Sequence, residues 1–208
     1  MNKSKGFFLT FEGPEASGKS SQIKLLEKYL NKNKIPFITT REPGGTKLSE
    51  SLRNLILKVK ESINVEEEIL MLMAARSHHI ENVIKPAMKN GKFVISDRFA
   101  DSTFVYQGYV NKFGIKRAKD LHKKMLSNFL PFKTFMFILP IKEIIKRLKK
   151  RNVSNKYDKI ETSFHKDVMK GYMKISKNDK RFILINALDS SSKINEQIIK
   201  ILNKILKK

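Results

Sequence analysis

Residues 6–21, GFFLTFEGPEASGKSS, join a short apolar run to a glycine-rich motif. The run at 7–11 has the composition of a fully buried strand. Residues 13–20 match G-x-x-x-x-G-K-[ST] at every fixed position, and a stretch with apolar residues at helical spacing follows. A strand before this motif and a helix after it form the context in which it binds phosphate groups.

Each fixed position of the motif has a chemical reason. Gly13 and Gly18 let the backbone approach phosphate oxygens closely, and N–H groups at the start of the helix point at those oxygens. Lys19 can reach the terminal phosphates, and Ser20 offers a hydroxyl to Mg²⁺. The motif therefore predicts a nucleoside triphosphate site, against the alternative of a glycine-rich turn without a ligand. The predicted ATP-binding residues are Gly13, Pro14, Glu15, Ala16, Ser17, Gly18, Lys19, Ser20 and Ser21.

Length and cysteine content limit the classes of protein. A chain of 208 residues suits one domain, 1–208, with a sizeable core. The absence of cysteine excludes disulfides, thiolate catalysis and cysteine-ligated zinc. Glu12 interrupts the first apolar run too early for a signal peptide, and no run approaches the length of a membrane span. We expect a soluble cytoplasmic protein with no membrane partner.

The formal net charge of +23 would ordinarily suggest nucleic acid as a partner. The basic residues are mostly lysines, scattered over the whole chain among many isoleucines and asparagines. This distribution indicates a composition bias rather than a designed binding surface, so we expect no specific nucleic-acid partner. A positive excess also suits an enzyme whose substrates are all polyphosphates.

Apolar runs and helical patterns alternate along the chain. Further strands are predicted at 35–40, 93–96, 134–139 and 182–185. Helices are predicted at 48–56, 65–88, 115–126 and 192–206. Uniformly apolar strands that alternate with helices predict an α/β fold, in which helices cover both faces of a parallel sheet. Ligands then gather at the carboxyl ends of the strands, where 13–20, 41–46 and 97–107 all fall.

A phosphate-binding loop alone does not separate a kinase from other nucleotide-binding proteins. The Asn-Lys-x-Asp motif of GTPases is missing, and a helicase or motor usually needs a longer chain. A small kinase needs a second anionic site and mobile cations. Arg98, directly after a buried strand, can grip a phosphate, and Arg53 and Arg76 are helical candidates with a solvated helix face as the alternative. The basic run at 141–151 can supply mobile cations, although part of it is expected to be a solvated face.

Four stretches together resemble the bacterial thymidylate kinases, in family order and over nearly the whole chain. They are 11–13 with the phosphate-binding loop, REPGGT at 41–46, DRF at 97–99 with Ser102 and YQG at 106–108, and DKIE at 158–161 with Gly171-Tyr172. The resemblance implies a three-layer P-loop kinase fold with a five-stranded parallel sheet and a short lid at about 149–163. It also implies transfer of phosphate from ATP to dTMP with Mg²⁺, giving dTDP for dTTP and DNA synthesis, in a homodimer.

The resemblance also implies roles for individual residues. Arg98 would hold the dTMP phosphate, Arg76 and Gln107 the thymine edge, and the Tyr106 ring would exclude a ribose 2′-hydroxyl. The implied catalytic residues are Lys19, Arg98, Glu15 and Arg151, and the metal residues are Ser20 and Asp97. The implied dTMP-binding residues are Glu15, Glu42, Pro43, Arg53, Leu72, Arg76, Arg98, Thr103, Tyr106 and Gln107. The implied lid residues are Lys149, Arg151 and Lys159.

The sequence departs from the family pattern in its base pocket and in its lid. Leu72 stands where the family often has phenylalanine stacked on thymine, so the base preference can be looser. The lid reads DKIE where arginine is usual, and lysine cannot make a bidentate phosphate clamp. The phosphate-binding loop carries no basic residue at Ala16 or Ser17, so the catalytic cation would come from the lid. The alternatives are a kinase for another nucleoside monophosphate or a deoxynucleoside, or a basic P-loop nucleic-acid-binding ATPase.

Overall fold

The computed structural model describes residues 6–58, 60–150 and 162–206. In this part of the chain, five parallel strands form one sheet in the order β2-β3-β1-β4-β5. The strands are β1 (Phe8–Glu12), β2 (Phe37–Arg41), β3 (Phe93–Asp97), β4 (Lys133–Ile138) and β5 (Phe182–Asn186). The register places Phe11 of β1 beside Asp97 of β3 and Phe135 of β4, so these strands end at one common edge.

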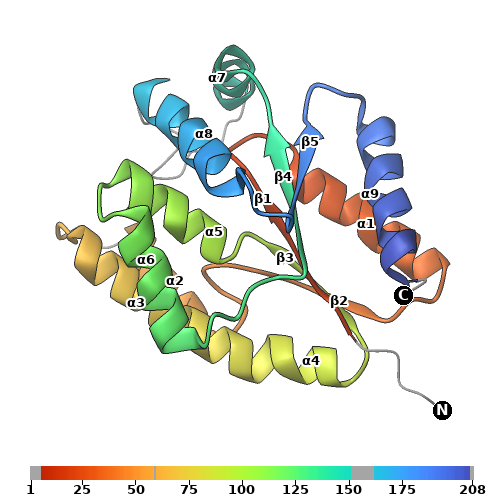
Figure 1. The fold of residues 1–208 in the computed structure, drawn as a ribbon, viewed down its shortest axis with the longest axis horizontal. Helices are drawn as coiled ribbons and strands as arrows, with labels where there is room; N and C mark the ends of the chain where they lie inside the picture. Colours follow the sequence, from red (N-terminus) through yellow and green to blue (C-terminus); the bar gives the residue numbers. More distant parts are fainter. Residues whose placement is uncertain (1–5, 59, 151–161, 207–208) are drawn as a thin grey trace.

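Helices cover both faces of this sheet, as Figure 1 shows. One face carries α1 (Lys19–Lys32), α7 (Ile141–Lys149) and α9 (Ser191–Leu206). The other carries α3 (Val65–His79), α4 (Lys85–Lys89), α5 (Ala100–Thr103), α6 (Ile115–Leu126) and α8 (Thr162–Ser176), with α2 (Lys47–Lys58) packed on α3. Two π-helical segments, η1 (Ile80–Ile84) and η2 (Phe104–Val110), complete this layer. The predicted α/β fold with helices on both faces is confirmed.

The central strands supply side chains alternately to two apolar clusters. Phe8 and Val94 are buried in the cluster under α3, α6 and α8, whereas their chain neighbours Leu9 and Ile95 are buried in the cluster under α1 and α9. This alternation follows from the two-residue period of a strand. Because both faces are covered, apolar residues occupy both sets of positions.

The structure adds one detail to the predicted elements and corrects another. The strands β2 and β5 lie at the edges of the sheet, and Leu184 of β5 is 44% exposed. The helix predicted at 65–88 is not one regular α-helix: η1 separates α3 from α4, in which Pro86 occupies the first turn. Proline has no N–H to donate, which explains why the regular hydrogen-bond ladder is interrupted just before it.

A buried ion pair ties α5 to the start of β5. Arg181 Nη1 and Nη2 donate to the two carboxylate oxygens of Asp101 at 2.6 and 2.8 Å, and Asp101 is 1% exposed. Arg181 Nη1 also donates to Thr134 Oγ1 of β4 at 2.6 Å. The pair therefore joins a helix to two neighbouring strands.

We expect Asp101→Ala to lower the free energy of unfolding by about 3 kcal/mol, because it removes the buried anion of a largely buried guanidinium and leaves it only the longer 3.3 Å contact with the more exposed Asp179. Urea denaturation followed by circular dichroism measures the change. Asp120→Ala is the matched control, since Asp120 pairs with Lys116 on the exposed face of α6 and its loss should leave the midpoint unchanged. Equal midpoints for the Asp101 variant and the wild type would contradict the prediction.

Candidate active site

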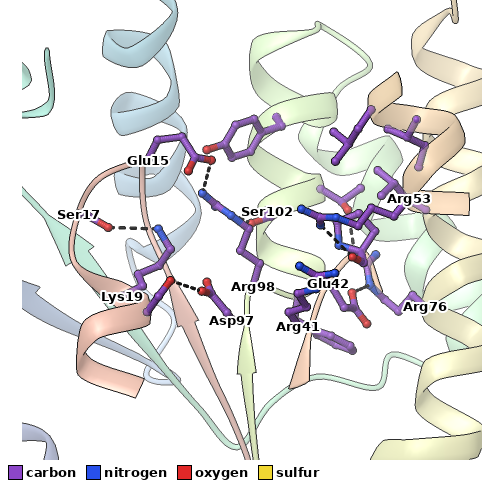
Figure 2. A pocket seen from close by; sticks show the side chains of 18 of the residues that line it. Glu15, Ser17, Lys19, Arg41, Glu42, Arg53, Arg76, Asp97, Arg98 and Ser102 are labelled. Carbon is purple, nitrogen blue, oxygen red and sulfur yellow. Dashed lines mark hydrogen bonds and ion pairs between the residues drawn. The ribbon is translucent and has the colours of Figure 1, made fainter. Parts of the chain in front are cut away.

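A cavity of about 290 Å³ lies at the carboxyl ends of β2 and β3. Figure 2 shows its two sides: the phosphate-binding loop contributes Glu15, Ser17 and Lys19, and Arg53 and Arg76 lie opposite, with Arg98 between them. Every residue predicted to bind dTMP lines this cavity: Glu15, Glu42, Pro43, Arg53, Leu72, Arg76, Arg98, Thr103, Tyr106 and Gln107. The cavity therefore unites segments that are far apart in the sequence, as the strand-end rule predicts.

The phosphate-binding loop holds a buried cation. Lys19 Nζ donates to Gly13 O at 3.1 Å, Pro14 O at 2.7 Å and Ser17 Oγ at 3.2 Å. Burial, followed by the nearby positive charge of Arg98, lowers the pKa of Lys19 to about 8. Gly13 is required here, because its φ is +137° and a Cβ would lie 2.7 Å from Phe137 O. The loop therefore keeps its ammonium group folded against its own backbone.

Ser20 and Asp97 bring two oxygen ligands together at the start of α1 and the end of β3. Ser20 Oγ donates to Asp97 Oδ2 at 2.8 Å, and both residues line the cavity. Within the ranges that the structure describes, no group of three or more His, Cys, Asp and Glu residues could hold a metal ion. A hydroxyl and a carboxylate beside a phosphate site are nevertheless the ligands that suit Mg²⁺, which keeps several waters and phosphate oxygens in its shell.

Arg98 is the central cation of the cavity. It follows β3 in the left-handed conformation, with φ 69°, and its N–H donates to Phe11 O at 3.0 Å. Its Nη2 donates to Glu15 Oε1 at 2.6 Å and its Nη1 to Gly13 O at 3.0 Å. Burial lowers the pKa of Arg98, but the negative charge of Glu15 opposes burial, and the pKa of Arg98 lies above its usual range. The guanidinium therefore stays charged and faces the phosphate-binding loop.

The loop at 41–46 is tied to α3 through the carboxylate of Glu42. Arg76 Nε donates to Glu42 Oε2 at 2.7 Å, and His79 Nδ1 lies 2.9 Å from Glu42 Oε1. Arg76 Nη2 donates to Thr103 Oγ1 at 2.9 Å, which links α3 to α5. Among the described residues, the buried Nη1 of Arg76 has no hydrogen-bond partner. Arg76 is thus held in place by Glu42 and Thr103.

The consecutive residues Tyr106 and Gln107 both line the cavity, and both lie on η2. The wider turn of a π-helix changes which neighbours share a face, and such segments are frequent at functional sites. The Arg98 guanidinium lies 5.3 Å from the centre of the Tyr106 ring, and burial raises the pKa of the Tyr106 phenol. Tyr106 therefore stays neutral beside the cation.

The family model described as thymidylate kinase matches residues 11–198. The chain belongs to the thymidylate kinase family. The resemblance predicted from its sequence motifs is thereby confirmed.

Individual thymidylate kinases match over almost their full length. That of Thermoanaerobacter sp. (strain X514) is 37% identical over 203 residues, which cover 97% of this chain and 100% of the relative. That of Clostridium novyi (strain NT) is 38% identical, over 93% of this chain and 97% of the relative. That of Staphylococcus epidermidis (strain RP62A) is 39% identical, over 96% of this chain and 98% of the relative. The similarity thus includes all the segments that meet in the cavity.

Several residues at or near this thymidylate kinase site were not predicted from the sequence. Arg147 of α7 donates from Nη2 to Ala187 O at 2.9 Å and from Nη1 to Ala16 O at 3.5 Å, so it braces the phosphate-binding loop. It belongs to the basic run at 141–151, but composition does not separate it from its neighbours. His79 of α3 makes a buried contact with Glu42, and no sequence motif singles it out.

The predicted lid is only partly described. Arg151 and Lys159 lie outside the described residues, and Lys149 is exposed at the end of α7. Their roles stay predictions. No helix in the described ranges is both long enough and apolar enough to span a membrane.

Proposed function

We propose that this chain transfers the γ-phosphoryl group of ATP directly to the phosphate of dTMP, giving ADP and dTDP. The observation that supports this most is the placement of two anion-binding groups in one cavity, Lys19 in the phosphate-binding loop and Arg98 between that loop and the pocket of Arg76. One cavity of this kind suits two phosphorylated substrates at once. Family membership favours this reaction over a nucleic-acid-binding ATPase.

To catalyse this transfer, the protein must position the two substrates and neutralise the charge on the transferred phosphoryl group. A phosphate oxygen of dTMP attacks the γ-phosphorus of ATP, the bond to the β-phosphate oxygen breaks, and ADP leaves. The acceptor is already a competent nucleophile, so no covalent enzyme intermediate is needed. Lys19 would hold phosphate oxygens of ATP, and Arg98 would hold the dTMP phosphate, with Glu15 as its anionic neighbour. Fixed donors of this kind stabilise charge that spreads over the transferred group.

The oxygens of Ser20 and Asp97 fit Mg²⁺, which would neutralise charge on the phosphate chain. On the acceptor side, Arg76, whose Nη1 has no partner among the described residues, and the amide of Gln107 suit the polar edge of thymine, beside Thr103. The buried ring of Tyr106 would lie against the deoxyribose, and Leu72 would pack on the base.

Further features of the proposal come from the resemblance to the family. Residues 1–208 would form a single domain that works as a homodimer in the cytoplasm. The lid at about 149–163 would close over ATP, with Lys149, Arg151 and Lys159 facing its phosphates, and Arg151 would supply the catalytic cation.

Release of ADP from Mg·ATP, with dTMP, dUMP, ribosyl TMP, dCMP, dGMP or thymidine as acceptor, tests the reaction. We expect dTMP to give the fastest turnover and thymidine to give none, because thymidine lacks the phosphate that Arg98 would hold. Fast turnover of dUMP or dCMP would indicate a broader base pocket around Leu72. ADP release that is indifferent to every acceptor but stimulated by DNA would overturn the proposal and favour the ATPase.

A further inference from the structure

A buried carboxylate lies behind Arg98. Glu12, the last residue of β1, is completely buried, and four donors converge on it. The N–H of Phe99 donates to Oε1 at 2.7 Å and the N–H of Ser102 at 3.3 Å. The Ser102 hydroxyl and the Tyr172 hydroxyl donate to Oε2 at 2.7 and 2.8 Å. Neither Glu12 nor Tyr172 is among the described residues that line the cavity, so the reaction as derived above does not use them.

The same two hydroxyl oxygens accept hydrogen bonds from the catalytic arginine. Arg98 Nη1 donates to Ser102 Oγ at 3.1 Å and to Tyr172 OH at 3.1 Å. A hydroxyl has one proton and two lone pairs. Because each hydroxyl donates its hydrogen bond to Glu12, the lone pairs of both oxygens are left to face the guanidinium. The carboxylate thereby orients two dipoles toward Arg98 without touching its guanidinium.

Glu12 also fixes the backbone next to Arg98. The left-handed conformation of Arg98 is unfavourable for a residue with a Cβ, so its surroundings must hold it. The peptide group that joins Arg98 to Phe99 is held at both of its polar atoms: Glu12 accepts from the Phe99 N–H, and the Arg98 carbonyl accepts from Ser96 Oγ at 2.7 Å. Backbone and guanidinium of Arg98 are therefore both anchored through one carboxylate.

The approach of Tyr172 depends on close packing of α8 against η2. A Cβ on Gly171 would lie 2.9 Å from Val105 Cγ1 and 3.0 Å from Tyr109 Cδ1, so glycine allows the two helices to touch. Tyr172 is completely buried, and burial raises the pKa of its phenol well above the usual value. It therefore remains a hydroxyl donor to Glu12 under ordinary assay conditions.

Burying the Glu12 carboxylate is costly, which indicates that its position serves a function. Burial, and then the negative charge of Asp101, raises the pKa of Glu12 to about 7, while Arg98 and the hydroxyls of Ser102 and Tyr172 oppose this rise. An apolar residue would avoid the cost of burying this carboxylate. The four hydrogen bonds offset part of the cost of burying the carboxylate and fix its orientation.

We propose that Glu12 and Tyr172 are positioning residues, which set the orientation of the Arg98 guanidinium toward the acceptor phosphate. The inference rests on the proposed function in one respect, that Arg98 binds the phosphate of dTMP. It adds that Glu12 of β1 and Tyr172 of α8 hold Arg98 in the orientation that binds this phosphate.

Calorimetric titration of Tyr172→Phe with dTMP and, separately, with thymidine tests the inference. The variant keeps the buried ring and removes only the hydroxyl. We expect the affinity for dTMP to fall about tenfold, because a hydrogen bond to a charged group is lost, and the affinity for thymidine to stay within about twofold. Glu12→Gln keeps the side-chain volume. It should likewise lower the affinity for dTMP and leave the affinity for thymidine nearly unchanged.

Tyr29→Phe is the matched control, since the Tyr29 hydroxyl donates to Asn203 at 2.9 Å on the opposite face of the sheet. We expect it to change neither affinity. Equal losses for dTMP and thymidine in Tyr172→Phe and Glu12→Gln would mean a general structural role and would overturn the inference, as would no loss in either variant. If the wild type binds dTMP no more tightly than thymidine, the phosphate-binding role of Arg98 itself is overturned. If the wild type prefers dTMP and both variants keep that preference, only the positioning role of Glu12 and Tyr172 is removed.

Discussion

Lys19→Ala is expected to lower kcat by about 10³-fold, the largest effect of any single change proposed in this chain. Lys19 is the ammonium group enclosed by the phosphate-binding loop, and its Nζ lies within hydrogen-bonding distance of the loop's own oxygens. Alanine leaves no cation there to meet the phosphates of ATP. Steady-state measurement of ADP release with saturating dTMP gives the kcat of variant and wild type.

Lys24→Ala is the matched control, because Lys24 is an exposed lysine on the same helix, outside the residues that line the cavity. Its turnover should equal that of the wild type. Circular dichroism establishes that the Lys19 variant is folded before its rate is compared. A folded Lys19→Ala protein with a kcat within tenfold of the wild type would contradict the role assigned to this residue.

Arg98→Ala is expected to reduce kcat/KM for dTMP by about 10²- to 10³-fold, while KM for ATP changes little. The change removes the guanidinium that faces the cavity and leaves the carboxylate of Glu15 without its 2.6 Å partner. Both effects disfavour an anionic acceptor. Initial rates over a range of dTMP concentrations, at fixed saturating ATP, measure the loss.

Arg98→Lys separates charge from geometry. Lysine restores a positive charge but not the planar fork of donors, so we expect it to recover only part of the lost kcat/KM. Retained dTMP affinity together with normal turnover in Arg98→Ala would remove Arg98 from the acceptor site. Equal rises in KM for ATP and dTMP would instead indicate collapse of the whole cavity.

The order of elements and the position of the site were predictable because they depend on local signals. The fixed spacing from Gly13 to Ser20 identifies the phosphate-binding loop, and Arg98 stands directly after an apolar run. Parallel strands bring such loops to one edge, so proximity follows from topology alone. The residues predicted to bind dTMP accordingly meet in one cavity, although their chemical roles stay proposals.

The details that escaped prediction depend on contacts between distant segments. The π-helical segment that carries Tyr106 and Gln107 leaves no periodic signal in a seven-residue stretch. Arg147 looks like any other basic residue in its run until α7 is placed beside the phosphate-binding loop. The hydroxyl of Tyr172 meets Glu12 across 160 residues of sequence, and no local rule connects positions so far apart.

The folded-back position of Lys19 has a consequence for how the loop chooses its ligand. An ammonium group has three N–H donors, and in this arrangement three protein oxygens lie within reach of them. A phosphate oxygen that contacts Lys19 therefore exchanges one hydrogen bond for another instead of adding one. The net gain comes from replacing a neutral carbonyl oxygen by a negatively charged one, so an uncharged ligand would gain almost nothing. The loop thus favours ligands that carry a negatively charged oxygen over uncharged ligands, whatever the rest of the ligand is.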